Sequence, residues 1–145
     1  MGFTVVHQYA YSSGTTSTQI SNIRAGCTSS TILCVGGRAT SSDILLTVAC
    51  GSCFIVTNTT VLNIPVLDNG VYWYNTPAKS FGFAPNATIN QASADVFDTE
   101  SQLRLSWHLD SYTGFRLGNL SSVYSGAYYK IILKKWKKVV VECEN

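Results

Sequence analysis

SQLRLSWHLDSYTGFRLG, residues 101–118, shows the clearest alternation of apolar and polar side chains in the chain. Large apolar residues occupy every second position near its middle: Leu103, Leu105, Trp107 and Leu109. Successive side chains of a β-strand point to opposite faces of the sheet, so this spacing predicts a strand with one apolar face. We expect the four residues to form a buried spine at the centre of a β-fold.

The polar face of the same strand carries Ser106, His108 and Asp110, which are the residue types of a serine hydrolase triad. Side chains two positions apart on a strand are separated by about 6.5–7 Å, which is too far for a relay of hydrogen bonds. No G-x-S-x-G motif presents a nucleophile at a strained turn. We therefore predict a hydrogen-bonded sheet histidine, no catalytic residue and no enzyme.

The composition predicts one domain with no membrane span and no nucleic-acid partner. At 145 residues the chain has the size of a single domain with a substantial core. The formal net charge is only +2, and half of the lysines and arginines fall within residues 130–138, which argues against a polyanion partner. No apolar run approaches the ~18 residues of a transmembrane helix.

Three N-glycosylation sequons begin at Asn58, Asn86 and Asn119. Together with paired cysteines and a charged content of only 12%, they predict a secreted, extracellular protein with N-linked glycans. The Ser- and Thr-rich segment 12–18 offers sites for O-linked sugar. The chain begins MGFTVVHQYAY without a signal-peptide pattern, so we interpret residue 1 as near a mature start, or the numbering as not that of the precursor.

Two structural disulfides are expected among four cysteines: Cys27, Cys34, Cys50 and Cys53. The six residues between Cys27 and Cys34 suit a local loop or hairpin disulfide, so this is the preferred pair. The other two cysteines then lie in the turn of a hairpin between strands at residues 43–49 and 54–57.

The C-x-x-C motif of Cys50 and Cys53 also has chemical interpretations. A strand-like run follows the motif, whereas thioredoxin-like chemistry needs a helix there. A zinc site of four cysteines is outweighed by disulfides in a secreted chain. We expect no metal and no cofactor, and Cys143 remains as a free thiol or an intermolecular bridge.

The rest of the chain consists of short β-type segments between turns. Residues 19–25 are expected to form a short strand, Pro65 makes residues 60–67 an edge or bulged strand, and Asp68-Asn69-Gly70 signals a turn. No long segment has the 3.6-residue period of an amphipathic helix. The expected fold is all-β, a two-sheet sandwich or jelly roll of about eight to ten strands, with residues 19–145 as one domain.

A loosely tethered strand is expected ahead of this domain, at residues 1–11. Its bulky face consists of five residues: Phe3, Val5, His7, Tyr9 and Tyr11. Segment 12–18 has no apolar residue and is typical of a flexible linker. A detached strand can complete the sheet edge of a neighbouring copy, and such head-to-tail contacts form filaments unless they close into a ring. The linker equally permits the strand to fold back onto its own sheet, and that alternative stays open.

Several motifs in the C-terminal half carry a family resemblance. They are SFGF (residues 80–83), INQ (89–91), Ala94-Asp95, Asp98, RLSWHL (104–109) and GFRLG (114–118). In these motifs the chain resembles a secreted β-rich module of extracellular proteins from aquatic micro-invertebrates. The resemblance implies an extracellular, glycosylated module, and it transfers no catalytic residue.

The preferred function is that of an extracellular glycosylated structural protein, a homo-oligomer built head-to-tail by strand addition. An alternative is a carbohydrate-binding, lectin-like module with a sugar-stacking platform at Tyr72, Trp73 and Tyr74, although alternation turns Trp73 away from its neighbours. A lower alternative is a glycoside hydrolase that uses two carboxylates. The candidate carboxylates are those of Asp95, Asp98, Glu100 and Asp110.

Overall fold

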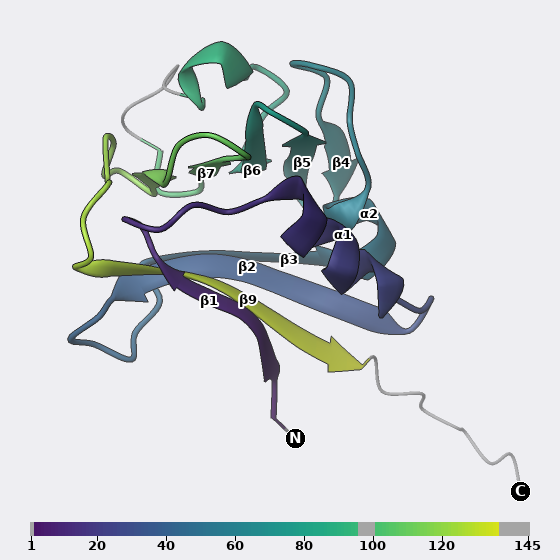
Figure 1. Cartoon of the computed structure of the whole chain (residues 1–145). Coiled ribbons are helices and arrows are strands. Elements are labelled where there is room, and N and C mark those ends of the chain that lie inside the picture. Colours follow the sequence, from purple (N-terminus) through teal and green to yellow (C-terminus); the bar gives the residue numbers. More distant parts are fainter. Residues whose placement is uncertain (1, 96–100, 137–145) are drawn as a thin grey trace, which may run out of the picture.

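The computed structural model describes residues 2–95 and 101–136, which fold into two facing antiparallel sheets (Figure 1). The four-stranded sheet has the order β1-β9-β2-β3, and the five-stranded sheet the order β4-β5-β6-β7-β8. The strands are β1 (Thr4–Ala10), β2 (Thr31–Ala39), β3 (Thr47–Ser52), β4 (Val66–Asp68), β5 (Val71–Thr76), β6 (Ser80–Ala84), β7 (Leu105–His108), β8 (Phe115–Leu117) and β9 (Tyr128–Trp136). The helical elements are α1 (Ser17–Ala25), α2 (Cys53–Thr57) and the 3-10 helix η1 (Gln91–Ser93). The predicted all-β, two-sheet sandwich is confirmed.

The predicted apolar spine is correct at three of its four positions. Leu105, Trp107 and Leu109 are fully buried. The Trp107 indole reaches across the core and stacks on the His7 ring of the opposite sheet, with the ring centroids 5.5 Å apart. Leu103 is 37% exposed, so its assignment to the core is wrong. The reason is that β7 begins only at Leu105, and residue 103 lies in the turn before it.

The first strand is part of its own chain's sheet. β1 pairs antiparallel with β9, with Gln8 opposite Ile131. Tyr11, one residue beyond β1, is fully buried, and its hydroxyl bonds to groups of β7 and β8. A buried hydroxyl must find partners inside the fold, so this tyrosine fixes the end of β1. The expectation of a loosely tethered strand is therefore wrong, and the fold-back alternative describes the chain.

The expected flexible linker, residues 12–18, is an ordered connection. The Lys130 ammonium donates hydrogen bonds to the Ser13 carbonyl at 2.7 Å and to the Thr15 hydroxyl at 3.0 Å. Thr16 and Gln19 form a capping box, in which each side chain accepts a hydrogen bond from the other's backbone amide. The described residues therefore form one domain without a separate N-terminal unit.

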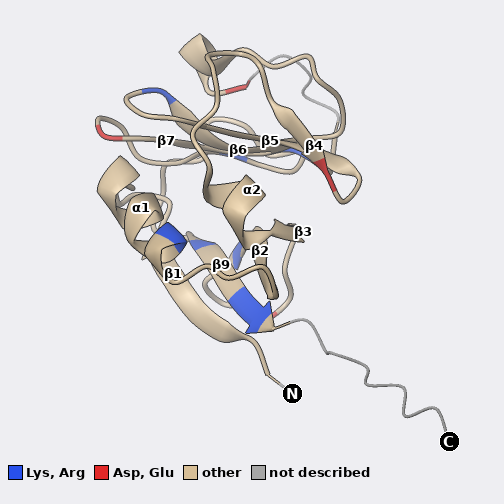
Figure 2. Ribbon diagram, turned by 90° about the vertical axis from the view of Figure 1, so that its right-hand side faces the viewer, with Lys and Arg blue, Asp and Glu red and all other residues tan. Residues whose placement is uncertain are grey.

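Two segments expected to be strands are helices. α1 occupies the segment expected as a strand at residues 19–25, and α2 occupies the one at residues 54–57. Figures 1 and 2 show both helices between the two sheets at one end of the sandwich. Figure 2 also shows that basic residues gather toward the C-terminal end of β9.

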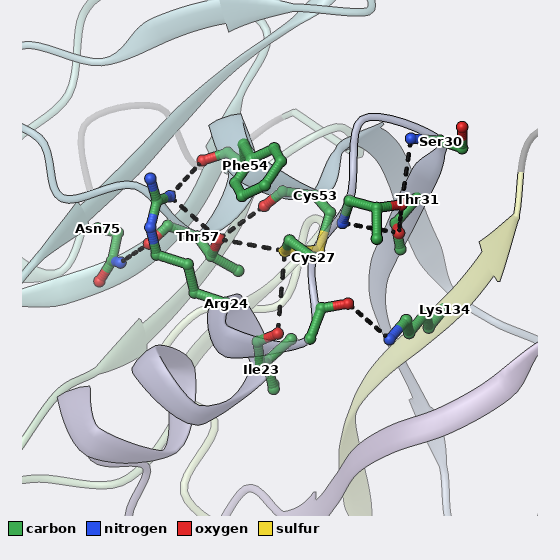
Figure 3. Close-up of a disulfide and its surroundings, with 12 residues drawn as sticks. Ile23, Arg24, Cys27, Ser30, Thr31, Cys53, Phe54, Thr57, Asn75 and Lys134 are labelled. Carbon is green, nitrogen blue, oxygen red and sulfur yellow. Dashed lines mark hydrogen bonds between the residues drawn. A yellow bond between two sulfur atoms is a disulfide. The ribbon is translucent and has the colours of Figure 1, made fainter.

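All four expected cysteines form disulfides, but their pairing differs from the prediction. Cys27 joins Cys53, and Cys34 joins Cys50 (the former in Figure 3). The register of β2 and β3 puts Cys34 directly opposite Cys50, and helix formation brings Cys27, after α1, to the start of α2. A local Cys27–Cys34 loop is therefore wrong. Cys143 lies outside the described residues.

Replacing Cys27 and Cys53 together by serine is expected to lower the free energy of unfolding. The two cysteines are 26 residues apart, and a loop of that length contributes about 3 kcal/mol through the entropy of the unfolded chain. Denaturant titration of the double variant measures the loss. Peptide mapping without reduction should recover Cys27 joined to Cys53, and a peptide joining Cys27 to Cys34 contradicts this fold.

Candidate functional site

A turn after β7 ties three parts of the fold together at one end of the five-stranded sheet. Asp110 adopts a left-handed backbone conformation with φ of 70°. Its carboxylate accepts hydrogen bonds from the amide and hydroxyl of Ser17, at 2.7 and 2.5 Å, and from the amide of Ala78 at 2.9 Å. Burial alone raises the pKa of Asp110, but these hydrogen bonds outweigh it and hold the pKa below its usual range. The turn is thereby fixed to the start of α1 and to the β5–β6 connection.

The residues on either side of β8 form a second fixed loop, which passes close to Tyr11. Gly114 donates its amide to the Tyr11 carbonyl at 2.9 Å, and a Cβ at this position collides with the Tyr11 ring. After β8, the buried Val123 donates its amide to the Phe115 carbonyl at 2.7 Å. This bond places the next residue, Tyr124, beside Phe115, with ring centroids 5.8 Å apart.

These loops line a shallow aromatic cleft of about 420 Å³ that is open to solvent. Its walls are the side chains of Ser93, His108, Tyr112, Phe115 and Tyr124. The His108 ring lies edge-on to Tyr112 at 5.4 Å and to Phe115 at 5.8 Å between centroids. Tyr112 is 67% exposed and Tyr124 is 44% exposed, so both phenol rings are available to a ligand.

The lining of the aromatic cleft is uncharged near neutral pH. Burial and the nearby charge of Lys130 lower the pKa of His108, so its imidazole is neutral. Partial burial and the neighbouring Tyr112 raise the pKa of Tyr124, so its hydroxyl keeps the proton. The cleft therefore combines aromatic faces with neutral hydrogen-bonding groups, and it suits a ligand without charge.

The sugar-stacking platform predicted from the sequence is not formed. Trp73 and Tyr74 are both buried, and only Tyr72 is partly accessible. The Trp73 indole donates to the Asp68 carbonyl, and the Tyr74 hydroxyl donates to the Leu105 carbonyl. The aromatic residues that do face solvent together, Tyr112 and Tyr124, were missed because they lie in turns and belong to no periodic pattern.

Ser106, His108 and Asp110 do not form a triad. Ser106 is fully buried, and the Asp110 carboxylate is occupied by Ser17 and Ala78 rather than by His108. No hydrogen bond among the described residues joins these three side chains.

The polar side of residues 104–108 is buried at Arg104 and Ser106, whereas His108 lines the aromatic cleft. Arg104 is buried, forms an ion pair with Asp95 at 2.6 Å, and donates to the Thr88 carbonyl. Residues 88–95 thereby cover this side of the five-stranded sheet. The pairing leaves the Asp95 carboxylate unavailable as a glycosidase acid or nucleophile, and the candidates Asp98 and Glu100 lie outside the described residues.

The three predicted sequon asparagines, Asn58, Asn86 and Asn119, are all exposed. Asn86 also has a structural role, because its Oδ1 accepts hydrogen bonds from the Thr88 amide and the Arg104 guanidinium. Exposure makes each site accessible to a glycan, and occupancy stays a prediction.

Lys130 and His7 form a buried basic pair behind Trp107. The Lys130 ammonium lies 5.7 Å from the centre of the Trp107 ring. Burial lowers the pKa of Lys130 to about 7, while burial and the charge of Lys130 lower the pKa of His7 to about 4. A lysine of this kind is a plausible base or nucleophile in an open site. Here it is fully buried, so the pair affects stability rather than chemistry.

No metal site or membrane-spanning helix is present in residues 2–95 and 101–136. No cluster of three histidine, cysteine, aspartate or glutamate residues there can hold a metal ion, and no helix there is long and apolar enough to cross a bilayer. No protein-family model, curated protein or solved structure matches the chain.

Raising the pH from 7 to 9 is expected to increase the free energy of unfolding by about 1.4 kcal/mol per pH unit. The folded chain loses the Lys130 proton at about 7, whereas the unfolded chain keeps it to 10.5. His7 has an effect of the same sign at lower pH, because its pKa is 6.5 in the unfolded chain and about 4 in the folded chain. The free energy of unfolding therefore falls as the pH is lowered from 6.5 to about 4.

Denaturant titrations of the native protein and of Lys130→Met, at several pH values, measure this dependence. The variant is expected to lose the rise above neutral pH and to keep the fall caused by His7. A flat profile for the native protein above neutral pH contradicts the lowered pKa of the buried Lys130.

Proposed function

We propose that the protein is a secreted carbohydrate-binding module that holds an uncharged saccharide in the aromatic cleft. The observation that carries the proposal is the pair of exposed tyrosines, Tyr112 and Tyr124, beside Phe115 and a neutral His108. The volume of about 420 Å³ falls within the roughly 300–1,000 Å³ typical of small-ligand sites.

The chemistry of the lining matches that of a sugar. A pyranose presents C–H groups on its faces, which pack on aromatic rings, and hydroxyls at its edge. Ser93, Tyr112 and Tyr124 offer hydroxyls at the rim, and the His108 ring offers a donor and an acceptor. A charged ligand finds no opposite charge on the described residues that line the cleft.

Substituting Tyr112→Ala or Tyr124→Ala is expected to weaken saccharide binding about tenfold or more, because a lost aromatic contact is worth about 1 kcal/mol and associated hydrogen bonds add to it. A glycan array identifies the ligand, and calorimetric titration measures the change. Tyr9→Ala is the matched control, since Tyr9 is 43% exposed but lies on β1, away from the cleft. Equal losses in all three variants, or silence on the array, remove the proposal.

A second candidate is an extracellular structural role through strand addition at β1. β1 is an edge strand that contains no charged residue, and Val5 within it and Phe3 just before it are exposed. Because Tyr11 donates its amide to Tyr128, alternation turns the amides of Gln8 and Ala10 away from β9. Unpaired edges of this kind favour addition of a strand from another copy.

Of the other three sheet edges, β3 and β8 are partly covered and β4 is only three residues long, which limits the geometry of such an assembly. Asp68 and Asn69 bond to the outer backbone of β3, and Val123 bonds to that of β8. Two copies are then expected to pair β1 with β1. This contact is isologous and closes at a dimer, in place of the open head-to-tail filament predicted from the sequence.

Gln8→Lys is expected to convert such a dimer into a monomer, because two copies of the lysine face each other near the symmetry axis. Analytical ultracentrifugation over a range of concentrations measures the change. Val48→Lys, at an exposed position of the covered β3 edge, serves as the control and should leave the dimer intact. A native protein that is monomeric at every concentration excludes this candidate.

A further inference from the structure

A small polar hollow lies between α1, the segment after α2 and the end of β5. Its volume is about 100 Å³, and its lining includes Ser17, Ser21, Arg24, Asn58, Asn75 and Pro77. The hollow is separate from the aromatic cleft, with which it shares no lining residue. One of the three sequon asparagines, Asn58, thus stands at its exposed rim.

Asn75 lines this hollow and has an unsatisfied acceptor in its side chain. The residue is only 4% exposed, and its Nδ2 donates to the Thr57 carbonyl at 3.0 Å. Its Oδ1 is buried and has no hydrogen-bond partner in the part of the chain that the structure describes. Figure 3 shows that this oxygen points away from Thr57. A buried acceptor without a donor is costly, so the position suits a ligand that brings a hydroxyl or an amide.

Arg24 forms a fixed wall of the hollow. Its guanidinium donates to the Phe54 carbonyl at 2.7 Å and to the Thr57 hydroxyl at 3.4 Å, and it lies 5.4 Å from the centre of the Phe54 ring. These contacts appear together in Figure 3. A wall held in this way can contact a ligand without a large loss of side-chain entropy.

We propose that Asn58 carries an N-linked glycan whose first N-acetylglucosamine covers the mouth of this hollow, places its acetamido group inside and donates that group's N–H to Asn75 Oδ1. The proposal rests on the secretion included in the proposed function, because N-glycans are attached in the secretory pathway. It does not depend on the aromatic cleft. The structure thereby distinguishes one sequon of three as the site where a glycan becomes part of the fold.

The size of the hollow favours a tethered sugar over a free one. Pockets that hold a free small ligand measure roughly 300–1,000 Å³, so a hollow of about 100 Å³ is too small for a free saccharide. A sugar attached to Asn58 is already held at the rim, at an effective concentration in the millimolar range for a short tether. Contacts with Asn75 and Arg24 that are too weak to bind a free sugar are then sufficient.

The fold also indicates when the glycan is attached. The hydroxyl of Thr60, the third residue of this sequon, accepts a hydrogen bond from the backbone amide of Asn75 at 3.0 Å. An enzyme that reads this hydroxyl therefore finds it only before β5 has docked. For the same reason Thr60 is a poor position for removing the sequon, and Asn58→Gln is the cleaner variant.

The test uses the full chain secreted from a eukaryotic cell line. Occupancy of each sequon is read by mass spectrometry, and thermal unfolding is measured before and after enzymatic trimming. Trimming to the first sugar should leave the melting temperature unchanged, whereas Asn58→Gln should lower it by about 2–4 °C. Asn119→Gln is the matched control and should have no effect. Under native conditions, full glycan release should be about tenfold slower from Asn58 than from Asn119.

Three results overturn the proposal. If Asn58 carries no glycan while Asn86 or Asn119 does, the proposed glycan contact with the hollow is wrong, but the protein is still secreted. Equal release from Asn58 and Asn119, or an unchanged melting temperature in Asn58→Gln, shows a glycan that does not touch the hollow. If all three sequons are unoccupied, the expectation of glycosylation is wrong as well. Saccharide binding by the aromatic cleft is tested separately by the Tyr112→Ala and Tyr124→Ala variants.

Discussion

The hydrogen bond from the Trp107 indole to the Tyr11 hydroxyl, 3.0 Å long and fully buried, connects the two sheets. Trp107 belongs to the five-stranded sheet, and Tyr11 follows β1 of the four-stranded sheet. The same hydroxyl donates to the Arg116 carbonyl at 3.0 Å. Burial raises the pKa of Tyr11 well above its usual range, so the hydroxyl keeps the proton that this second bond requires. One side chain therefore satisfies two buried polar groups from two different strands.

The aromatic cleft depends on this contact, although Tyr11 does not line it. The ring of Tyr11 fills the space next to Gly114, so only glycine permits the chain to pass at that point. The glycine directly precedes Phe115, which forms the floor between His108 and Tyr124. The bulky N-terminal strand thus supports the loops that carry the exposed rings. Tyr11, which the sequence analysis assigned to a strand that could bind a neighbouring copy, is therefore packed inside the core of its own chain.

The parts of the fold that were predicted correctly depend on local patterns. Leu105, Trp107 and Leu109 were recognisable because strand alternation needs only the neighbouring residues. The cysteine partners were not, because Cys34 meets Cys50 through the register of two strands, which spacing along the chain does not encode. The helix at α1 had a local signal, the Thr16-x-x-Gln19 capping box, but its weak amphipathic pattern concealed it.

The candidate site was hidden from sequence reasoning for a different reason. Strand alternation distinguishes an apolar face from a polar one, and a polar face is normally expected to contact solvent. Arg104 lies on the polar face of its segment but is buried, because the Asp95 carboxylate neutralises its charge. Conversely, Tyr112 and Tyr124 stand in turns, where no period marks an exposed aromatic residue.

The aromatic cleft and the polar hollow also differ in what they can hold. A free ligand must offset its loss of translational freedom with the contacts it makes, so it needs the larger, ring-lined cleft. A ligand already bonded to the chain has lost most of that freedom beforehand, so one buried acceptor and one fixed guanidinium suffice. The aromatic cleft and the polar hollow are therefore proposed to hold different kinds of sugar, one that arrives by diffusion and one that is attached to Asn58.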